Sequence, residues 1–217
     1  MQNLINKFHE FLPSLIKGTQ YTIEITVLGI ILSTIFGFVF SQALLSKRKL
    51  INRPVRILIN VVRGTPLLVQ MFYVYFVLPD LGITLGALEA AVLSLSICYG
   101  AYHAEIFRAG IMSIPLGQWE AATSLGLKHH QILRRIVLPQ AARIILPPLG
   151  TSCIILLKDS SLASVITVRE LTRSGQLIAS TTFENLTVYS MVALIYILLT
   201  QLLALLVHSM ERKYRLK

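Results

Sequence analysis

Lys158 and Asp159 are adjacent charges of opposite sign at the end of a long apolar stretch, and Ser160 and Ser161 follow them directly. A charged side chain in such a setting is costly and usually has a functional role or a pairing partner. A cation, an anion and two hydroxyl groups could bind a small zwitterion, with Lys158 on its carboxylate and Asp159 or the serines on its ammonium group. The alternative is a structural ion pair. We therefore predict either a ligand site or a structural pair at these four residues.

Other residue types that could do chemistry are scattered along the chain. Glu105 and Arg108 have the i, i+3 spacing that places them on one helix face and favours a structural salt bridge over a proton relay. His129 and His130 are adjacent and point to different faces, whereas metal-binding histidines on a helix are spaced so as to share one face. The acids are scattered singly, without a metal-ligand set or a nucleophile–base motif. The sequence thus predicts no catalytic residue and no bound metal.

The composition is that of a membrane protein. Of 217 residues, 54% are hydrophobic and only 14% are charged, and the mean hydropathy is +0.69; soluble domains carry about a quarter charged residues. The formal net charge of +10 would suggest nucleic acid for a soluble chain. Here the basic residues cluster beside apolar spans, as the positive-inside rule describes, so we expect no nucleic-acid partner. Cys98 and Cys153 lie in apolar segments and are expected to be small buried hydrophobes.

Hydropathy and charge predict an all-α integral membrane protein with about five transmembrane helices. An amphipathic segment, residues 1–21, precedes a single transmembrane domain, residues 22–217. The basic, acid-free loop at 46–56 and the basic tail at 211–217 are expected in the cytoplasm, which places the N-terminus outside and the C-terminus inside. The expected spans are residues 22–45, 55–78, 85–111, 136–157 and 186–207, and a cytoplasmic loop covers residues 114–135.

The second expected span is interrupted by Arg63, Gly64, Thr65 and Pro66, which we assign a structural role. Thr65 before Pro66 is a favourable helix start, with a capping residue followed by proline in the first turn. We expect a basic interfacial segment, a break at Gly64, and then the span proper. Residues 158–182 are too polar for a span and too apolar for a solvated loop, so we expect broken helix packed inside the protein.

A long polar passage, Gln118–Gln140, separates two apolar segments. Trp119–Leu125 can form about two helical turns, and its small alanines would let a partner surface approach the backbone. Gly126 can adopt a left-handed conformation that ends this helix. The pattern is E-A-A-x3-G-x9-I-x-L-P, carried by Glu120, Ala121, Ala122, Gly126, Ile136, Leu138 and Pro139.

This pattern resembles the cytoplasmic coupling loop of the permease subunits of binding-protein-dependent ABC importers, and it matches at every fixed position. Four further passages, residues 63–70, 104–111, 117–122 and 157–162, resemble the polar amino-acid branch of these permeases. The resemblance implies a type I importer permease fold. It also implies that Trp119, Glu120, Ala121, Ala122, Gly126, Ile136, Leu138 and Pro139 couple the chain to an ATPase.

The resemblance further implies a set of partners in a bacterial inner (cytoplasmic) membrane. These are an ABC ATPase dimer inside, an extracytoplasmic amino-acid-binding protein outside, membrane lipid, and a second permease copy in a homodimer or heterodimer. The chain contains no G-x-x-x-x-G-K-[ST] phosphate loop. We therefore expect no cofactor in this chain, with ATP and Mg bound by the partner ATPase, and no enzymatic activity of its own.

The branch includes histidine, arginine, glutamine, glutamate, cystine and opine carriers. Residues 140–143 and 146–149 look slightly closer to cystine-type members. The expected function is uptake of a polar amino acid of the cystine type, or of the arginine, histidine or glutamine type, delivered by the binding protein. The alternative is a membrane-embedded enzyme acting on a lipid or a small polar substrate.

Overall fold

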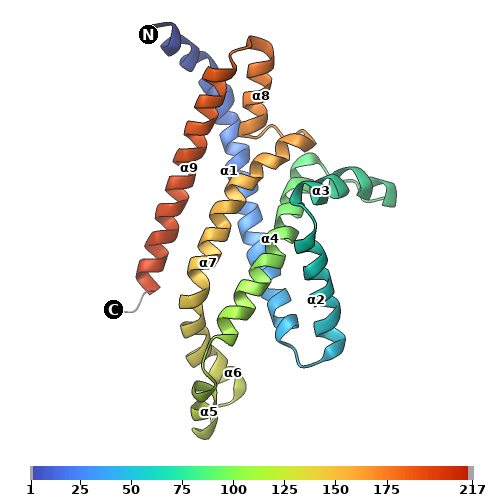
Figure 1. Ribbon diagram of the computed structural model, residues 1–217, viewed down its shortest axis with the longest axis vertical. Coiled ribbons are helices and arrows are strands. Elements are labelled where there is room, and N and C mark those ends of the chain that lie inside the picture. The colour runs from blue at the N-terminus through green and yellow to red at the C-terminus, as the bar shows by residue number, and fades with distance from the viewer. Residues whose placement is uncertain (1, 215–217) are drawn as a thin grey trace.

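A computed structural model describes residues 2–214 of the chain, with side chains described from residue 9 to residue 213; part of the expected basic tail lies outside this range. The described part is helical and contains no strand (Figure 1). In chain order its elements are α1 (Gln2–Leu45), α2 (Lys49–Gly64), α3 (Leu67–Phe72), η1 (Tyr73–Val77), η2 (Leu78–Leu81), α4 (Ala87–Met112), α5 (Leu116–Ser124), α6 (His129–Ile132), η3 (Leu133–Val137), α7 (Leu138–Asp159), η4 (Ser160–Ile166), α8 (Leu171–Thr182) and α9 (Asn185–Tyr214).

Four stretches are long and apolar enough to cross a membrane, and the number rises to five if the bent pair formed by α2 and residues 67–81 is counted as one span. The structure thus has the helical architecture that the sequence predicts. The outside position of the N-terminus stays a prediction. Helix α1 continues without interruption across residues 21 and 22, where we had expected the amphipathic segment to meet the first span.

Helices α1 and α4 pack against each other along most of the bundle (Figure 1). Glycine makes this close approach possible, because a Cβ on Gly100 of α4 would lie 2.9 Å from the Cβ of Phe36 on α1. Seven residues before Phe36 on α1, a Cβ on Gly29 would lie 3.2 Å from a methyl carbon of Leu156 on α7. Helices α1, α4 and α7 therefore form the closely packed centre around which the other elements are arranged.

The second span is bent by 105° between α2 and the segment that follows it. Its geometry differs from our expectation, since α2 runs beside α1 and α4, and the segment that begins with α3 turns sharply and projects to the side of the bundle (Figure 1). The break lies at Thr65 rather than at Gly64, because proline disfavours helical backbone in the residue before it and Thr65 is extended with φ −106° and ψ 132°. Thr65 does not cap α3; its hydroxyl donates to the Val61 carbonyl at 2.8 Å.

Gln70 holds this bend in place. Its side-chain amide donates to the carbonyl of Val62 at 2.8 Å and to the carbonyl of Thr65 at 2.9 Å. Carbonyls at the C-terminal end of a helix lack partners within the helix. Gln70 supplies those partners across the bend, so the angle between α2 and α3 is fixed by hydrogen bonds as well as by Pro66.

The polar stretch after α7 is broken helix, as predicted. The 3₁₀ helix η4 ends at Ile166, the next residue Thr167 has a left-handed φ of 70°, and α8 begins after Glu170. Glu170 is fully buried and caps α8 by accepting hydrogen bonds from the backbone N–H groups of Thr172 and Arg173 at 2.8 and 2.7 Å. The Tyr196 hydroxyl donates to the same carboxylate at 2.8 Å, which ties α8 to α9.

Candidate functional site

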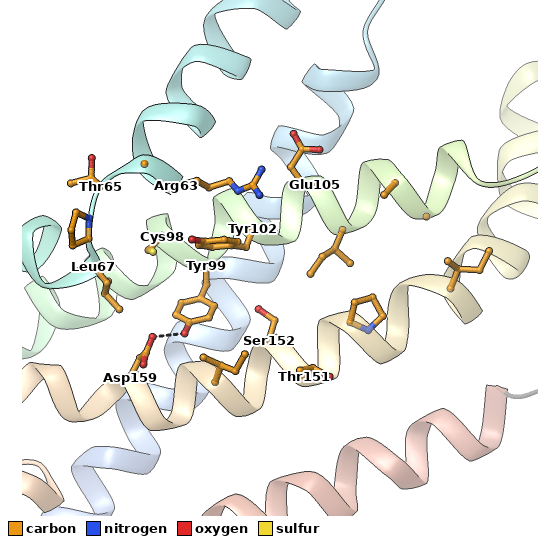
Figure 2. A pocket seen from close by; sticks show the side chains of 18 of the residues that line it. Arg63, Thr65, Leu67, Cys98, Tyr99, Tyr102, Glu105, Thr151, Ser152 and Asp159 are labelled. Atoms are coloured by element: carbon orange, nitrogen blue, oxygen red, sulfur yellow. Dashed lines mark hydrogen bonds between the residues drawn. The ribbon is translucent and has the colours of Figure 1, made fainter.

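A cavity of about 1240 Å³ lies between α4, α7 and the junction of α2 with α3 (Figure 2). Along α4 it extends from Cys98 to Ser113, close to the end of that helix. Its walls are mostly apolar, and the residues with charged or hydrogen-bonding groups are Arg63, Thr65, Cys98, Tyr99, Tyr102, Glu105, Ser113, Thr151, Ser152 and Asp159. A large cavity with a few polar groups is the usual form of a small-molecule site.

Charged groups of both signs line this cavity. The Tyr99 hydroxyl donates to the Asp159 carboxylate at 2.6 Å, which orients the carboxylate at the cavity wall (Figure 2). The Arg63 guanidinium lies 5.2 Å from the centre of the Tyr102 ring, a cation–π distance. Figure 2 shows the Arg63 side chain reaching over Tyr102 in the direction of Glu105. Glu105 forms the predicted salt bridge with Arg108 at 2.8 Å.

The four residues predicted as one ligand site are not brought together. Asp159 lines the large cavity, whereas Lys158 and Ser161 line a second cavity of about 520 Å³ beside α8 and α9. Ser160 is buried and donates to the Leu157 carbonyl at 2.7 Å. Successive residues on a helix are separated by about 100°. Lys158 and Asp159 therefore line different cavities.

The aromatic and hydroxyl groups of the large cavity were missed by the sequence reasoning. Tyr99 and Tyr102 precede Glu105 on α4 at intervals of three residues, so they share its face. Ser152 lies on the facing wall and is held by a hydrogen bond of 2.9 Å between its Oγ and Nε2 of the fully buried His103. The three-residue spacing of Tyr99, Tyr102 and Glu105 could have indicated a shared polar face on α4. The contact between α4 and α7 could not be predicted from the sequence of either helix.

The predicted coupling passage forms two short helices, α5 and α6, that project from one end of the bundle (Figure 1). Gly126 has the predicted left-handed conformation with φ 74°. Its N–H donates to the Thr123 carbonyl at 2.9 Å, and the Leu127 N–H donates to the Ala122 carbonyl at 3.2 Å. Such bonds close the C-terminal end of a helix, so the glycine directs the chain from α5 into α6.

The members of the motif divide into an exposed face and a packed face. Glu120 and Ala121 are exposed. Ala122 is buried, and the ring of Trp119 stacks on His129 with centroids 5.7 Å apart. Two apolar side chains missed by the motif, Leu116 and Leu125, are 76% and 79% exposed at opposite ends of α5. The outer face of α5 therefore offers a carboxylate, a small residue and two uncovered leucines.

The last three motif residues join this region to α7. Ile136 packs in the apolar cluster that also contains Ala122, whereas Leu138 and Pro139 are exposed. The wider π turn η3 lies immediately before them. Proline removes a helix hydrogen bond and crowds the preceding turn, so a widened turn at this position accommodates Pro139 without ending the helix.

Among the described residues, no group of three or more histidine, cysteine, aspartate or glutamate side chains could hold a metal ion.

Comparison with known families agrees with this geometry. The family described as "Binding-protein-dependent transport system inner membrane component" matches residues 25–216. The chain belongs to this family. It is a multi-pass membrane protein and a transport subunit rather than the membrane-embedded enzyme considered as an alternative; in this family the ATPase is a separate subunit.

Similar proteins include two from Bacillus subtilis (strain 168). The chain is 42% identical to the probable amino-acid ABC transporter permease protein YckA over 205 residues, covering 94% of this chain and 91% of YckA. It is 40% identical over 204 residues to the L-cystine transport system permease protein TcyB, covering 94% of this chain and 87% of TcyB. A solved structure described as an amino acid ABC transporter with histidines has a TM-score of 0.89 and 37% identity, covering 95% of this chain and 97% of its own.

Proposed function

We propose that the chain is the permease subunit of an ATP-driven importer that carries a polar amino acid across a bacterial inner membrane, and that the large cavity is part of the substrate route. The observation that carries the proposal is the placement of Asp159 and Arg63 on the walls of one cavity. An amino acid presents an ammonium and a carboxylate group. A cavity that offers a carboxylate and a guanidinium is complementary to both.

Asp159 is the proposed partner of the substrate ammonium group. Its carboxylate already accepts a hydrogen bond from Tyr99, so its orientation is fixed before the substrate arrives. Arg63 is the proposed partner of the carboxylate, because a guanidinium can bind both carboxylate oxygens at once. Lys158, which we had predicted for this role, has no part in the proposal because it lines the other cavity.

The proposed substrate class is a polar amino acid of the cystine type or of the arginine, histidine or glutamine type. Two similar proteins support the general class and differ in the particular substrate. TcyB is described as an L-cystine permease, and the solved transporter is described with histidines. The remaining polar groups of the cavity, including Glu105, Thr151 and Ser152, are available to a polar side chain.

The proposed partners follow from the two ends of the molecule. An ABC ATPase dimer, with bound ATP and Mg, docks on the exposed face of α5, where Leu116 and Leu125 supply apolar area and Glu120 supplies charge. A binding protein delivers the amino acid from the opposite side of the membrane. A second permease, either a copy of this chain or a related one, closes the open side of the cavity.

The test is uptake into proteoliposomes that contain this chain, its ATPase and its binding protein. Labelled cystine, histidine, arginine, glutamine and glutamate are supplied with the binding protein, and ATP is placed on the ATPase side. We expect ATP-dependent accumulation of at least one of them, competed by the unlabelled compound. Liposomes with an ATPase that binds but does not hydrolyse ATP are the control. Absence of accumulation for every amino acid, with ATP hydrolysis intact, would overturn the proposal.

A further inference from the structure

Helix α2 has three distinct faces. The face packed on α1 and α4 carries Asn52, Val55, Ile59 and Val62. A second face is apolar and exposed, with Leu50, Ile57, Leu58 and Val61. The third face, which we call the basic stripe, carries polar residues spaced three and four positions apart. They are Lys49, Arg53, Arg56, Asn60 and Arg63, and all of them are exposed.

The two exposed faces require different surroundings. Hydrocarbon can cover the apolar face, but it cannot cover a row of cations without a large cost. No ion pair between described residues involves the four cations of the basic stripe, and Arg56 has only a hydrogen bond of 3.3 Å from its Nε to the Asn52 side chain. The stripe therefore needs water or an anionic group along its length.

One end of the basic stripe enters the large cavity. Arg63 lines that cavity and lies over Tyr102 of α4. From there the stripe runs back along α2 to Lys49, near the end of α1, while the cavity runs along α4 to Ser113, just before α5. In Figure 1 both directions lead toward the end of the bundle that carries α5 and α6. The stripe and the cavity thus leave the centre of the molecule on the same side.

We propose that the basic stripe is one wall of a water-filled exit that leads from the cavity to the end of the bundle carrying α5 and α6. Its cations interact one after another with the carboxylate of the departing substrate. The inference rests on the proposed function and adds an exit route with a charge preference. Arg63 and Arg56 are seven residues apart, or about 10 Å along a helix. Asn60 lies between them and can donate a hydrogen bond to the same carboxylate. A row of like charges raises the local concentration of an anionic group.

The first test compares two positions at nearly the same depth. Residues 58 and 60 lie on opposite sides of α2, since two helical steps turn the side chain by about 200°. Asn60→Cys and Leu58→Cys are prepared in the complete transporter after replacement of Cys98 and Cys153 by alanine and confirmation that uptake persists. A charged, membrane-impermeant methanethiosulfonate is added from the side of the membrane that faces α5 and α6. A thiol reacts as its thiolate, which apolar surroundings disfavour.

We expect Asn60→Cys to react at least about tenfold faster than Leu58→Cys, because only the former would be in water where the thiolate forms. Addition of the transported amino acid and ATP should slow labelling at residue 60 alone. Equal rates at the two positions, or labelling at residue 60 that the substrate never changes, would overturn the exit route. Lipid headgroups or a protein partner covering the stripe would give one of these two results.

The second test removes one cation from the stripe and one from outside it. Arg56→Gln should lower the maximal uptake rate by about tenfold through loss of the local attraction for anions, with the half-saturating substrate concentration unchanged. Arg56→Lys should keep most of the rate, and the matched control Lys47→Gln, in the loop before α2, should match the wild type. Wild-type uptake by Arg56→Gln at equal incorporation would contradict the inference. Absence of amino-acid uptake by the unmodified transporter would instead refute the proposed function.

Discussion

The end of the bundle that carries α5 and α6, which we call the coupling end after its predicted role, and the large cavity are built in different ways. At the coupling end, the residues of interest lie in α5, the turn at Gly126 and the start of α7, within one continuous passage. The cavity draws its polar groups from α2, α4 and α7, which are distant in the sequence and meet only through packing. The first surface therefore depends on local backbone geometry. The second depends on how far each helix is rotated toward its neighbours.

The largest effect is expected from breaking the local geometry of the coupling end. Gly126→Val places a β-branched residue at a left-handed φ of 74°, which costs about 1–3 kcal/mol in strain and would redirect the chain between α5 and α6. Uptake in proteoliposomes should fall to background, while membrane insertion remains because the turn projects from the bundle. ATP hydrolysis should lose its stimulation by the loaded binding protein.

A matched control exists in the same region. A Cβ on Gly117, in the first turn of α5, would have no atom within 4 Å, and this glycine is not among those with positive φ. Gly117→Ala should therefore transport normally. Glu120→Lys, which reverses the charge on the exposed face of α5, should also reduce uptake. Normal uptake by both Gly126→Val and Glu120→Lys at equal expression would show that α5 is not the docking element.

The next largest effect is expected in the cavity. There the position of a residue around the axis of α7 decides which of the adjacent charges, Lys158 or Asp159, lines the cavity. Asp159→Asn should weaken binding of the amino acid and lower uptake by about 10- to 100-fold, because a hydrogen-bonded charge contributes about 1.5–3 kcal/mol. Lys158→Met should leave substrate binding nearly unchanged, since Lys158 faces the other cavity. Both are measured as substrate affinity and as basal and stimulated ATP hydrolysis.

Tyr99→Phe separates orientation from charge at the same site. It removes the hydroxyl that donates to Asp159 and keeps the ring, so its effect should be smaller than that of Asp159→Asn. If Lys158→Met abolished binding and Asp159→Asn did not, the assignment of the two cavities would be reversed.

These two regions also show what the sequence could and could not predict. Gly126, the short helix before it and a break just before Pro66 were predicted because each depends on local backbone preferences. The break lies at Thr65, one residue after the predicted Gly64, and the directions of α2 and α3 could not be predicted from the local sequence. Lys158 and Asp159 were grouped because they are adjacent, although adjacency on a helix turns side chains apart.

The end of the bundle that carries α8 shows the same limit in another residue. Glu170 follows Arg169 as a second pair of adjacent opposite charges, which the sequence reasoning did not single out. The structure buries Glu170 completely and gives its carboxylate the N-terminus of α8 and Tyr196 as partners. The burial of Glu170 depends on the packing of α8 against α1 and α9, and no sequence pattern within residues 160–182 predicts that packing.

A smaller effect is expected from removing this cap. Glu170→Ala should lower the stability of the protein by about 0.5–2 kcal/mol, seen as a lower thermal midpoint in detergent. Burial raises the pKa of Glu170, although hydrogen bonds from Thr172, Arg173 and Tyr196 oppose the shift. A raised pKa means that the folded state binds the proton more tightly than the unfolded state. The stability that protonation adds is therefore present at low pH and is lost as pH rises through the folded-state pKa.

Glu170→Gln tests this sign. The amide oxygen can still accept a backbone hydrogen bond and has no charge to bury. The thermal midpoint of the wild type should fall more steeply than that of Glu170→Gln as pH is raised from the acidic side. Parallel curves for the two proteins would show that the charge on Glu170 does not contribute to pH-dependent stability.

The smallest effect is expected at Gly64, which separates local backbone preference from packing at the bend. A Cβ at Gly64 would have no neighbour within 4 Å, and the residue is the last of α2. If Pro66 and the hydrogen bonds of Gln70 set the bend, then Gly64→Ala should stabilise the protein slightly, by about 0.4–1 kcal/mol through loss of freedom in the unfolded chain, with uptake unchanged. Gln70→Leu, which leaves the carbonyls of Val62 and Thr65 without that partner, should destabilise it. Gly64 also lines the large cavity. A loss of uptake in Gly64→Ala would therefore mean either that the bend flexes at this residue during transport or that the added methyl group obstructs the substrate route.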